Sequence, residues 1–360
     1  MNLQFCLTSF AHKVWQSKGV VSTCLLPLSL IVKGVAQRKQ RRFQTQAELA
    51  WRAPVPVVVV GNIFVGGTGK TPVVIALAHA LRAQGWNPGV ISRGYGVRTG
   101  AAPLVLPVSP DPSQVGDEPA LIARATAAPV AVHPRRKLAA QALLQANPEV
   151  DVLISDDGLQ HLELSRNLEI VVQDERGIGN GRLLPAGPLR EPADRLTSVD
   201  YLLTQRLRLP PQGTPPTTGF RPIAIDMSMC PSRVIHLVSG TELSWNAWVQ
   251  AHASQRPSAA AAIGNPARFF DMLKLSGLAP AAVMPLPDHY DYRESPFGML
   301  GEAPILITPK DAVKCRHLQD NRLWAVQTET QFSDPGWLND VHRRLQALPP
   351  AQNRRPDENQ

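Results

Sequence analysis

Residues 57–72 have the sequence Val-Val-Val-Val-Gly-Asn-Ile-Phe-Val-Gly-Gly-Thr-Gly-Lys-Thr-Pro, and the rest of the chain is interpreted outward from them. A run of β-branched valines leads into a glycine-rich loop, which closes with Gly69-Lys70-Thr71 at the start of a helical pattern. Strand, glycine-rich loop and helix in this order are the parts of a P-loop, which holds the phosphates of a nucleotide. The stretch therefore predicts nucleotide binding.

The residue types in the loop suit that chemistry. Glycine lacks Cβ, so the backbone can point successive N–H groups at phosphate oxygens, and the following helix adds its positive N-terminal end. Lys70 would reach the β- and γ-phosphates, and the Thr71 hydroxyl would bind Mg²⁺. We therefore predict that the nucleotide contacts Phe64, Val65, Gly66, Gly67, Thr68, Gly69, Lys70 and Thr71.

The loop departs from the usual P-loop pattern at one position. G-x-x-x-x-G-K-[ST] would place its first glycine at position 64, where this chain has Phe64, and the nearest glycine before it is Gly61. The path of the loop is therefore open, and so is the alternative of a glycine-rich turn that binds no ligand.

Composition and charge narrow the class of protein. The chain has 360 residues, 44% hydrophobic and 18% charged, which is a globular balance, and its length favours two domains. Residues 1–52 hold eight Lys or Arg against one acid, so almost all of the net charge of +8 lies there. A basic face for nucleic acid is therefore not expected. The four cysteines show no metal-ligand spacing, which indicates a reduced protein without structural zinc.

The N-terminal segment has a pattern of its own. Val20 to Val32 carry no charge, and basic residues follow, Lys33, Arg38 and Arg42 among them. A helix this short does not cover the roughly 30 Å of a bilayer core, so we predict a helix that lies in one leaflet, with its basic end at anionic head groups. A buried core helix and a signal peptide are the alternatives.

Beyond the P-loop, short apolar strands alternate with helices. This alternation predicts a parallel sheet with helices on both faces, where ligands bind at the carboxyl ends of the strands. The expected strands are 57–60, 88–92, 129–132, 150–154, 168–172 and 201–204, and the expected helices start at 70, 119 and 134.

Acidic residues lie where that architecture would place a site. Asp156-Asp157-Gly158 follows an apolar strand, so its carboxylates can hold Mg²⁺, although Asp-Gly is also a common turn. Asp117 precedes the helix at Pro119, where it is either an N-cap or a base directed at the nucleotide.

The domain boundaries follow from composition. A proline-rich stretch, 208–222, separates two α/β regions. In the second region the expected strands are 222–227, 233–238, 259–263, 305–308 and 323–327, and the expected helices begin at 266 and 310. We predict an anchor and basic segment at 1–48, followed by a P-loop kinase core at 49–207. A connection at 208–222 leads to a smaller α/β domain at 223–347 and a disordered tail at 348–360.

Several motifs together resemble one known family. They are Gly61-Asn62 with Gly66 to Pro72, Ser92-Arg93-Gly94-Tyr95-Gly96, Gly116-Asp117-Glu118-Pro119, Asp156 to His161, Arg182 to Pro192, Gly264-Asn265-Pro266 with Arg268-Phe269-Phe270, Asp288-His289 and Lys310 to Lys314. In this order they resemble the tetraacyldisaccharide 4'-kinase family, the membrane-bound lipid A kinases of Gram-negative bacteria.

The resemblance implies a function and roles for matching residues. It implies ATP- and Mg²⁺-dependent phosphorylation of the 4'-hydroxyl of tetraacyldisaccharide 1-phosphate, by a monomer at the cytoplasmic face of the inner membrane. Asp117 would be the catalytic carboxylate, acting with His289, and these residues come from different domains, so the site would lie in the cleft between them. Thr71, Asp156, Asp157 and Glu191 would support the metal.

A function of another class remains open on the residues alone. The chain could be a membrane-associated P-loop ATPase or switch protein. The deviant loop of partitioning ATPases has lysine before the double glycine, where this chain has Val65, and Pro309 interrupts any guanine-specific motif before Lys310. Both features argue against this alternative. A membrane adaptor that binds nucleotide without chemistry is a third possibility.

Overall fold

The structure, a computed structural model, describes residues 14–15, 17–94, 102–107, 110, 115–210, 222–288 and 290–349. The strands are β1 (Val57–Gly61), β2 (Pro88–Ser92), β3 (Leu104–Val105), β4 (Val130–Val132), β5 (Val152–Asp156), β6 (Leu168–Asp174), β7 (Tyr201–Arg206), β8 (Ile223–His236), β9 (Glu242–Ser244), β10 (Ser258–Ala261), β11 (Val283–Pro285), β12 (Ile305–Ile307) and β13 (Leu323–Phe332). The helices are α2 (Val20–Cys24), α3 (Leu26–Thr45), α4 (Lys70–Ala83), α6 (Asp117–Thr126), α7 (Arg136–Ala146), α8 (Trp245–His252), α9 (Pro266–Leu275), α10 (Pro309–Cys315) and α11 (Trp337–Gln346).

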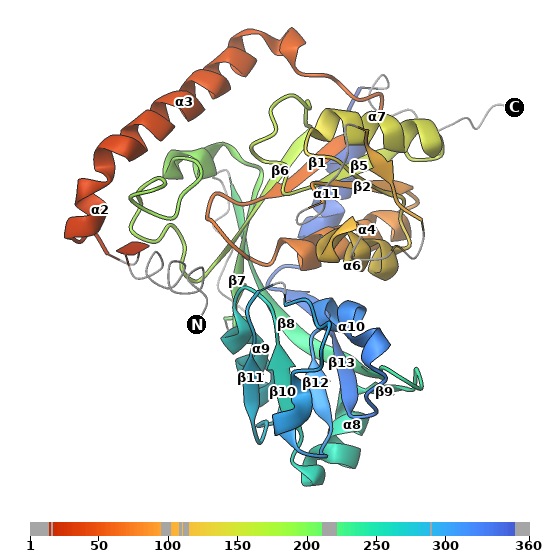
Figure 1. The fold of residues 1–360 in the computed structure, drawn as a ribbon. Helices are drawn as coiled ribbons and strands as arrows, with labels where there is room; N and C mark the ends of the chain where they lie inside the picture. The colour runs from red at the N-terminus through yellow and green to blue at the C-terminus, as the bar shows by residue number, and fades with distance from the viewer. Residues whose placement is uncertain are drawn as a thin grey trace, which may run out of the picture.

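All strands of the described residues belong to one continuous sheet, shown in Figure 1. Their order is β11-β10-β12-β13-β8-β7-β6-β1-β5-β2-β4-β3, with β9 paired to β8. The pairs β8–β13, β8–β9 and β3–β4 are antiparallel, and the others are parallel. The mixed α/β fold with a mostly parallel sheet is confirmed.

The first lobe is built around β1, which lies between β5 and β6. The valines of β1 alternate between two cores: Val58 and Val60 pack with side chains of α4 and α6, whereas Val57 and Val59 pack with those of α7. Helices therefore cover both faces of the sheet, and a strand buried on both faces needs an unbroken apolar run. This explains the four consecutive valines.

Two strands join the first lobe to the second lobe, which holds β9 to β12 and α8 to α10 (Figure 1). The first half of β8 pairs with β7, its second half pairs with β9, and β13 runs antiparallel along its length. The sequence predicted two strands here, 222–227 and 233–238, but the structure has one. Pro231 cannot donate a ladder hydrogen bond, and the register shifts beside it, so the strand carries a bulge and continues.

The last helix, α11, packs on the first lobe. Trp337, Val341 and Leu345 are buried in the same core as β1 and α4. The Tyr201 hydroxyl donates to Asp340 at 2.6 Å, and the ring centroids of Tyr201 and Trp337 are 5.6 Å apart. The region 223–347 therefore contributes its first strand and last helix to the first lobe.

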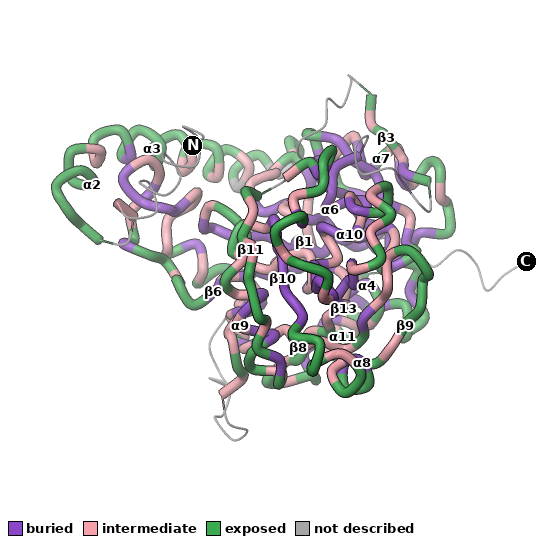
Figure 2. The backbone as a smooth tube through the Cα atoms, turned by 60° about the horizontal axis from the view of Figure 1, so that its bottom comes forward, coloured by how far each residue is buried: buried purple, intermediate pink, exposed green. Residues whose placement is uncertain are grey.

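The N-terminal helices α2 and α3 lie along one side of the molecule, and they bury polar side chains while exposing apolar ones. Ser22 and Ser29 are buried and donate to the carbonyls of Ala186 and Leu183, whereas most of the large apolar side chains of α2 and α3 are exposed (Figure 2). The alternative of a buried core helix is therefore wrong. Within the described residues, no helix has both the length and the apolar character that crossing a membrane requires.

Candidate active site

The glycine-rich loop connects β1 to α4. Gly66 and Gly69 have φ values of +100° and +90°, in the left-handed region that favours glycine. Asn62, which is fully buried, donates through Nδ2 to the Gly66 carbonyl at 3.1 Å and to Thr68 Oγ1 at 3.0 Å. One amide side chain therefore fixes the turn from inside and leaves Val65, Gly66, Gly67 and Gly69 lining a cavity.

Phe64 settles the path of the loop. Its buried ring lies under the guanidinium of Arg176, with 4.4 Å between the guanidinium carbon and the ring centroid, and its backbone forms a β-bridge with Leu189. The backbone N–H of Val65 then donates to Pro188 O at 2.9 Å. An aromatic anchor and a second backbone segment hold the loop at the position where the usual pattern has glycine. Phe64 and Thr68, both predicted to contact nucleotide, are buried.

Lys70, at the start of α4, faces the acidic pair that follows β5. Its Nζ lies 3.5 Å from Asp157 Oδ1, and Arg190 Nη1 lies 3.1 Å from both Asp157 oxygens. Burial alone would raise the pKa of Asp157, but Lys70 and Arg190 outweigh it, so the pKa is lowered. Asp157 is therefore held ionised.

Asp156 is in a different environment. Ser92 donates to Asp156 Oδ2 at 2.9 Å, while the buried Oδ1 has no hydrogen-bond partner among the described residues. Burial raises the pKa of Asp156 to about 6, and the carboxylate of Glu118 adds to this effect. The buried guanidinium of Arg136 donates to Asp156 O at 3.1 Å. An oxygen without a partner at a strand end suits a cation.

Glu191 belongs to a separate network. Gln160 donates to Glu191 Oε1 at 2.6 Å, and Arg195 Nε lies 3.3 Å from Glu191 Oε2. Both carboxylate oxygens therefore have protein partners. The predicted metal residues are divided: Thr71, Asp156 and Asp157 line the cavity, and Glu191 does not. Among the described residues there is no group of three or more His, Cys, Asp or Glu side chains that could hold a metal.

Asp117 begins α6 and is paired across the lobes. Lys314 Nζ, from α10, lies 2.7 Å from Asp117 Oδ2, and both side chains are largely buried. One turn earlier, Lys310 Nζ lies 3.6 Å from Glu118 and 3.7 Å from Asp288. The other predicted catalytic residue, His289, and Tyr95 of the glycine-tyrosine motif lie outside the described residues.

The cavity lies between the two lobes and has a volume of about 1110 Å³. The first lobe contributes the loop, the start of α4 and the acidic pair, and the second contributes residues of α9 and the start of α10. The two joining strands, β8 and β13, line the cavity between them. Carboxylates and cations at strand ends in a cleft of this size suit phosphoryl transfer, which depends on positioning and charge neutralisation.

Several contacts in the site had no assigned role from the sequence. Arg190 forms an ion pair with Asp157, and Lys314 forms one with Asp117. Both cations belong to the family motifs quoted from the sequence, so their place in these motifs could have indicated that they pair with the acids of the site. Gln205 accepts from Arg268 at 2.8 Å and packs against Gly69, and no sequence pattern indicated it.

Comparison with known proteins identifies the family. The family model described as Tetraacyldisaccharide-1-P 4'-kinase matches residues 21–346. The tetraacyldisaccharide 4'-kinase of Bordetella petrii is 54% identical over 340 residues, covering 94% of this chain and 95% of the relative. The chain belongs to the tetraacyldisaccharide 4'-kinase family. The Bordetella parapertussis kinase of the same name is 53% identical, covering 96% of this chain and all of the relative.

A solved structure of this kinase family supports the fold. The crystal structure of LpxK from Aquifex aeolicus in complex with ATP matches with a TM-score of 0.73 and 26% identity, covering 91% of this chain and 100% of that chain. The predictions of this family and of an ATP-dependent kinase are confirmed, and a membrane-associated ATPase or switch protein is not favoured.

Proposed function

We propose that this chain transfers the γ-phosphoryl group of ATP to the 4'-hydroxyl of tetraacyldisaccharide 1-phosphate, a step of lipid A biosynthesis. The observation that carries the proposal is one cavity lined by Asp157, which pairs with Lys70 and Arg190, and by Glu118 at the start of α6. Asp117, which pairs with Lys314, is the residue before Glu118. A kinase needs a nucleotide end and an acceptor end in one cleft, and the names of the relatives supply the acceptor.

The nucleotide end is the glycine-rich loop, which we propose as the P-loop. Its backbone N–H groups and Lys70 would hold the phosphates. Thr71, Asp156 and Asp157 fit Mg²⁺, because they offer hard oxygens and Asp156 Oδ1 has no other partner among the described residues. When bound, Mg²⁺ would neutralise phosphate charge. Glu191 instead orients Gln160 and Arg195 beside the acidic pair.

The acceptor end is Asp117. We propose that its carboxylate accepts the proton of the sugar 4'-hydroxyl and that His289 assists. Glu118, the next residue, lines the cavity, so the start of α6 borders the bound substrates. Lys314 compensates the charge of Asp117 from the second lobe. Phosphoryl transfer needs the hydroxyl oriented and its proton removed late, which this arrangement suits.

A substrate that lies in the membrane accounts for the exposed apolar side chains of the N-terminal helices. Leu30, Ile31 and Val35 are 64%, 64% and 66% exposed, while Ser22 and Ser29 face the protein. We propose that this apolar face dips into the cytoplasmic leaflet of the inner membrane and brings the site to its substrate.

The test is turnover in detergent solution with ATP, Mg²⁺ and the disaccharide 1-phosphate lipid, followed by the mass of the lipid product. Wild type should add one phosphate, and Asp117→Asn should lose at least about 100-fold in kcat, the scale expected for general base catalysis. Asp271→Asn, an exposed aspartate on α9, is the matched control and should keep full activity. Intact ATP hydrolysis without phosphorylated lipid would overturn the proposal.

A further inference from the structure

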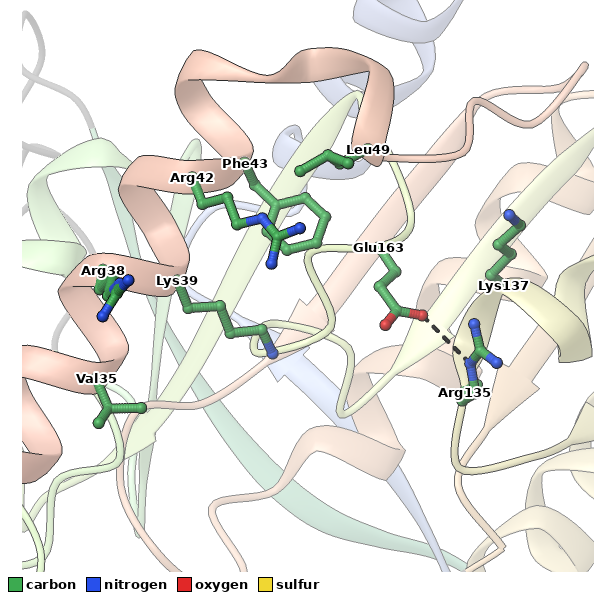
Figure 3. Close-up of a pocket in the computed structure, with 9 residues that line it drawn as sticks. All are labelled: Val35, Arg38, Lys39, Arg42, Phe43, Leu49, Arg135, Lys137 and Glu163. Carbon is green, nitrogen blue, oxygen red and sulfur yellow. Dashed lines mark hydrogen bonds and ion pairs between the residues drawn. The ribbon is translucent and has the colours of Figure 1, made fainter.

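A second cavity, of about 670 Å³, lies between the C-terminal half of α3 and the start of α7, apart from the cleft between the lobes (Figure 3). Figure 3 shows Arg38, Lys39 and Arg42 of α3 on one side, facing Arg135 and Lys137 of the α7 segment on the other. Five cationic side chains therefore surround one space. A single acid, Glu163, stands among the lining residues.

The positive charge of this basic cavity is mostly not neutralised by the protein. Glu163 pairs with Arg135 at 3.4 Å. In the described part of the chain, Arg38, Arg42 and Lys137 make no ion pair. Arg38 and Arg42 stand four residues apart on one helix, where like charges destabilise it. A space that gathers unpaired cations in this way is complementary to an anion.

Both walls of the basic cavity are connected to the active-site edge of the sheet. On the α3 side, Lys39 Nζ donates to Gln160 O at 3.1 Å, and the Gln160 side chain donates to Glu191. On the α7 side, Arg135 precedes Arg136, which donates to Asp156 O. A ligand spanning the loop 156–161 would therefore touch the acidic pair at one end and the basic cavity at the other.

The group between the two ends carries no charge of its own. Burial lowers the pKa of His161 to about 4, and the cations Arg136 and Lys39 add to this effect. His161 is therefore neutral at pH 7 and can donate or accept a hydrogen bond to an uncharged part of a ligand. The loop therefore has the acidic pair at one end, the cations of the basic cavity at the other, and a neutral imidazole close to both.

The basic cavity also borders the proposed membrane face. Val35 lines it and is 66% exposed, and it follows Leu30 and Ile31 on the apolar side of α3. A lipid with its acyl chains along this face would bring its polar head to the cations. The expected ligand is therefore an anionic phosphate attached to a lipid.

We propose that the basic cavity binds the 1-phosphate of the disaccharide lipid while its 4'-hydroxyl lies in the cleft between the lobes. This inference rests on the proposed function. A phosphate monoester with close to two negative charges matches several guanidinium and ammonium groups, and arginine binds phosphate in a bidentate manner. Binding one end of the disaccharide would decide which hydroxyl meets the nucleotide, so these residues determine specificity.

The test compares two lipids in neutral detergent micelles, the disaccharide 1-phosphate and the same disaccharide lacking the 1-phosphate. Lys39→Gln combined with Arg42→Gln should raise KM for the 1-phosphate lipid about 10–100-fold, the loss expected for charge-assisted hydrogen bonds, and leave kcat within about twofold. The same variant should not change KM for the lipid without the phosphate. Arg41→Gln, on the same helix but outside the cavity, is the matched control and should behave as wild type.

Three results would overturn this inference. The first is an equal loss on both lipids, which would indicate damage to the fold. The second is an equal loss in Arg41→Gln, and the third is a loss seen only with phosphatidylglycerol vesicles, which would assign the cations to membrane head groups. Calorimetric measurement of the binding of each lipid without ATP tests whether the cavity binds the 1-phosphate, independently of turnover. If wild type phosphorylates neither lipid yet the double variant binds the 1-phosphate lipid more weakly, the proposed function fails and the phosphate site stands.

Discussion

Lys314 Nζ lies 2.7 Å from Asp117 Oδ2, and the two residues come from different lobes. The exposed fractions of the two side chains are 15% and 8%, so solvent screens the pair little. Lys314 also donates to Tyr290 O at 3.0 Å, which fixes its position from within its own lobe. The second lobe therefore supplies the counter-ion of the carboxylate that we propose as the base.

Removing that counter-ion should change the pH dependence of catalysis. Without the positive charge of Lys314, the buried Asp117 is easier to protonate, so its pKa rises and the base is ionised only at higher pH. We expect Lys314→Met to lower kcat/KM about 10–100-fold near pH 7 and to move the acidic limb of the pH profile to higher pH.

A conservative variant separates electrostatics from structure. Lys314→Arg keeps the charge, so its acidic limb should coincide with that of wild type even if kcat falls. The measurement is kcat/KM between pH 5 and pH 9, with thermal stability as the control. An unchanged profile in Lys314→Met would show that this ion pair does not govern the ionisation of Asp117.

Asp156 should destabilise the metal-free protein above pH 6. Burial raises its pKa to about 6 from an unfolded value near 3.8, so the folded protein holds its proton more tightly. Stability is then unaffected below pH 4, falls as pH rises towards 6 and stays lower above it, by about 3 kcal/mol at most. With EDTA present, Asp156→Asn should therefore melt higher than wild type at pH 8 and close to it at pH 4.

Mg²⁺ should offset the destabilisation that the ionised Asp156 causes in wild type. A cation at Asp156 stabilises the ionised form, so adding Mg²⁺ should raise the melting temperature of wild type at pH 8 more than at pH 5, where the proton competes. Asp156→Asn should respond less at both pH values. Equal responses in wild type and variant would place the metal away from Asp156.

Gly69 should tolerate no side chain. Its φ is +90°, and a Cβ there would lie 2.2 Å from Gln205 Oε1, whose amide is held by Arg268. Gly69→Ala should cost about 1–3 kcal/mol of stability and weaken ATP binding, because the strained conformation and the clash act together. A Cβ on Gly67 meets nothing within 4 Å, so Gly67→Ala should keep its stability. Urea unfolding of both variants decides the point, and equal losses would contradict it.

The sequence predicted the parts of the fold that depend on local patterns. The strand at Pro88–Ser92 has the predicted bounds, and Val73, Val74, Leu77 and Leu81 are the buried face of α4. Strands covered on both faces must be apolar runs, and helices on them must be amphipathic, so both are visible in any short window. Lys70 and Thr71, which the glycine-rich stretch predicted as phosphate and Mg²⁺ residues, line the cavity between the lobes.

Contacts between distant segments could not be predicted in this way. Lys314 meets Asp117 only because α10 and α6 pack together, and no periodicity in either segment specifies the other. The sequence predicted separate strands at 222–227 and 233–238, whereas pairing along β13 continues past Pro231 and outweighs one missing hydrogen bond. Ser22 and Ser29 resembled ordinary members of an apolar run, and their burial depends on the carbonyls of a loop more than 150 residues away.

Membrane binding should depend on the exposed apolar face of α3 and leave the fold unchanged. Ile31 is 64% exposed, so Ile31→Asp removes no core contact but places a charge where we propose that the helix meets lipid. This variant should sediment with phospholipid vesicles at least about tenfold less than wild type, since burying a charge at a bilayer surface outweighs the area of one side chain. Ser29→Ala is the opposite case: it removes two buried hydrogen bonds to the Leu183 and Ala186 backbone and should lower the melting temperature without weakening sedimentation. If Ile31→Asp sediments as wild type does, α3 is not the membrane contact and its apolar face has another partner.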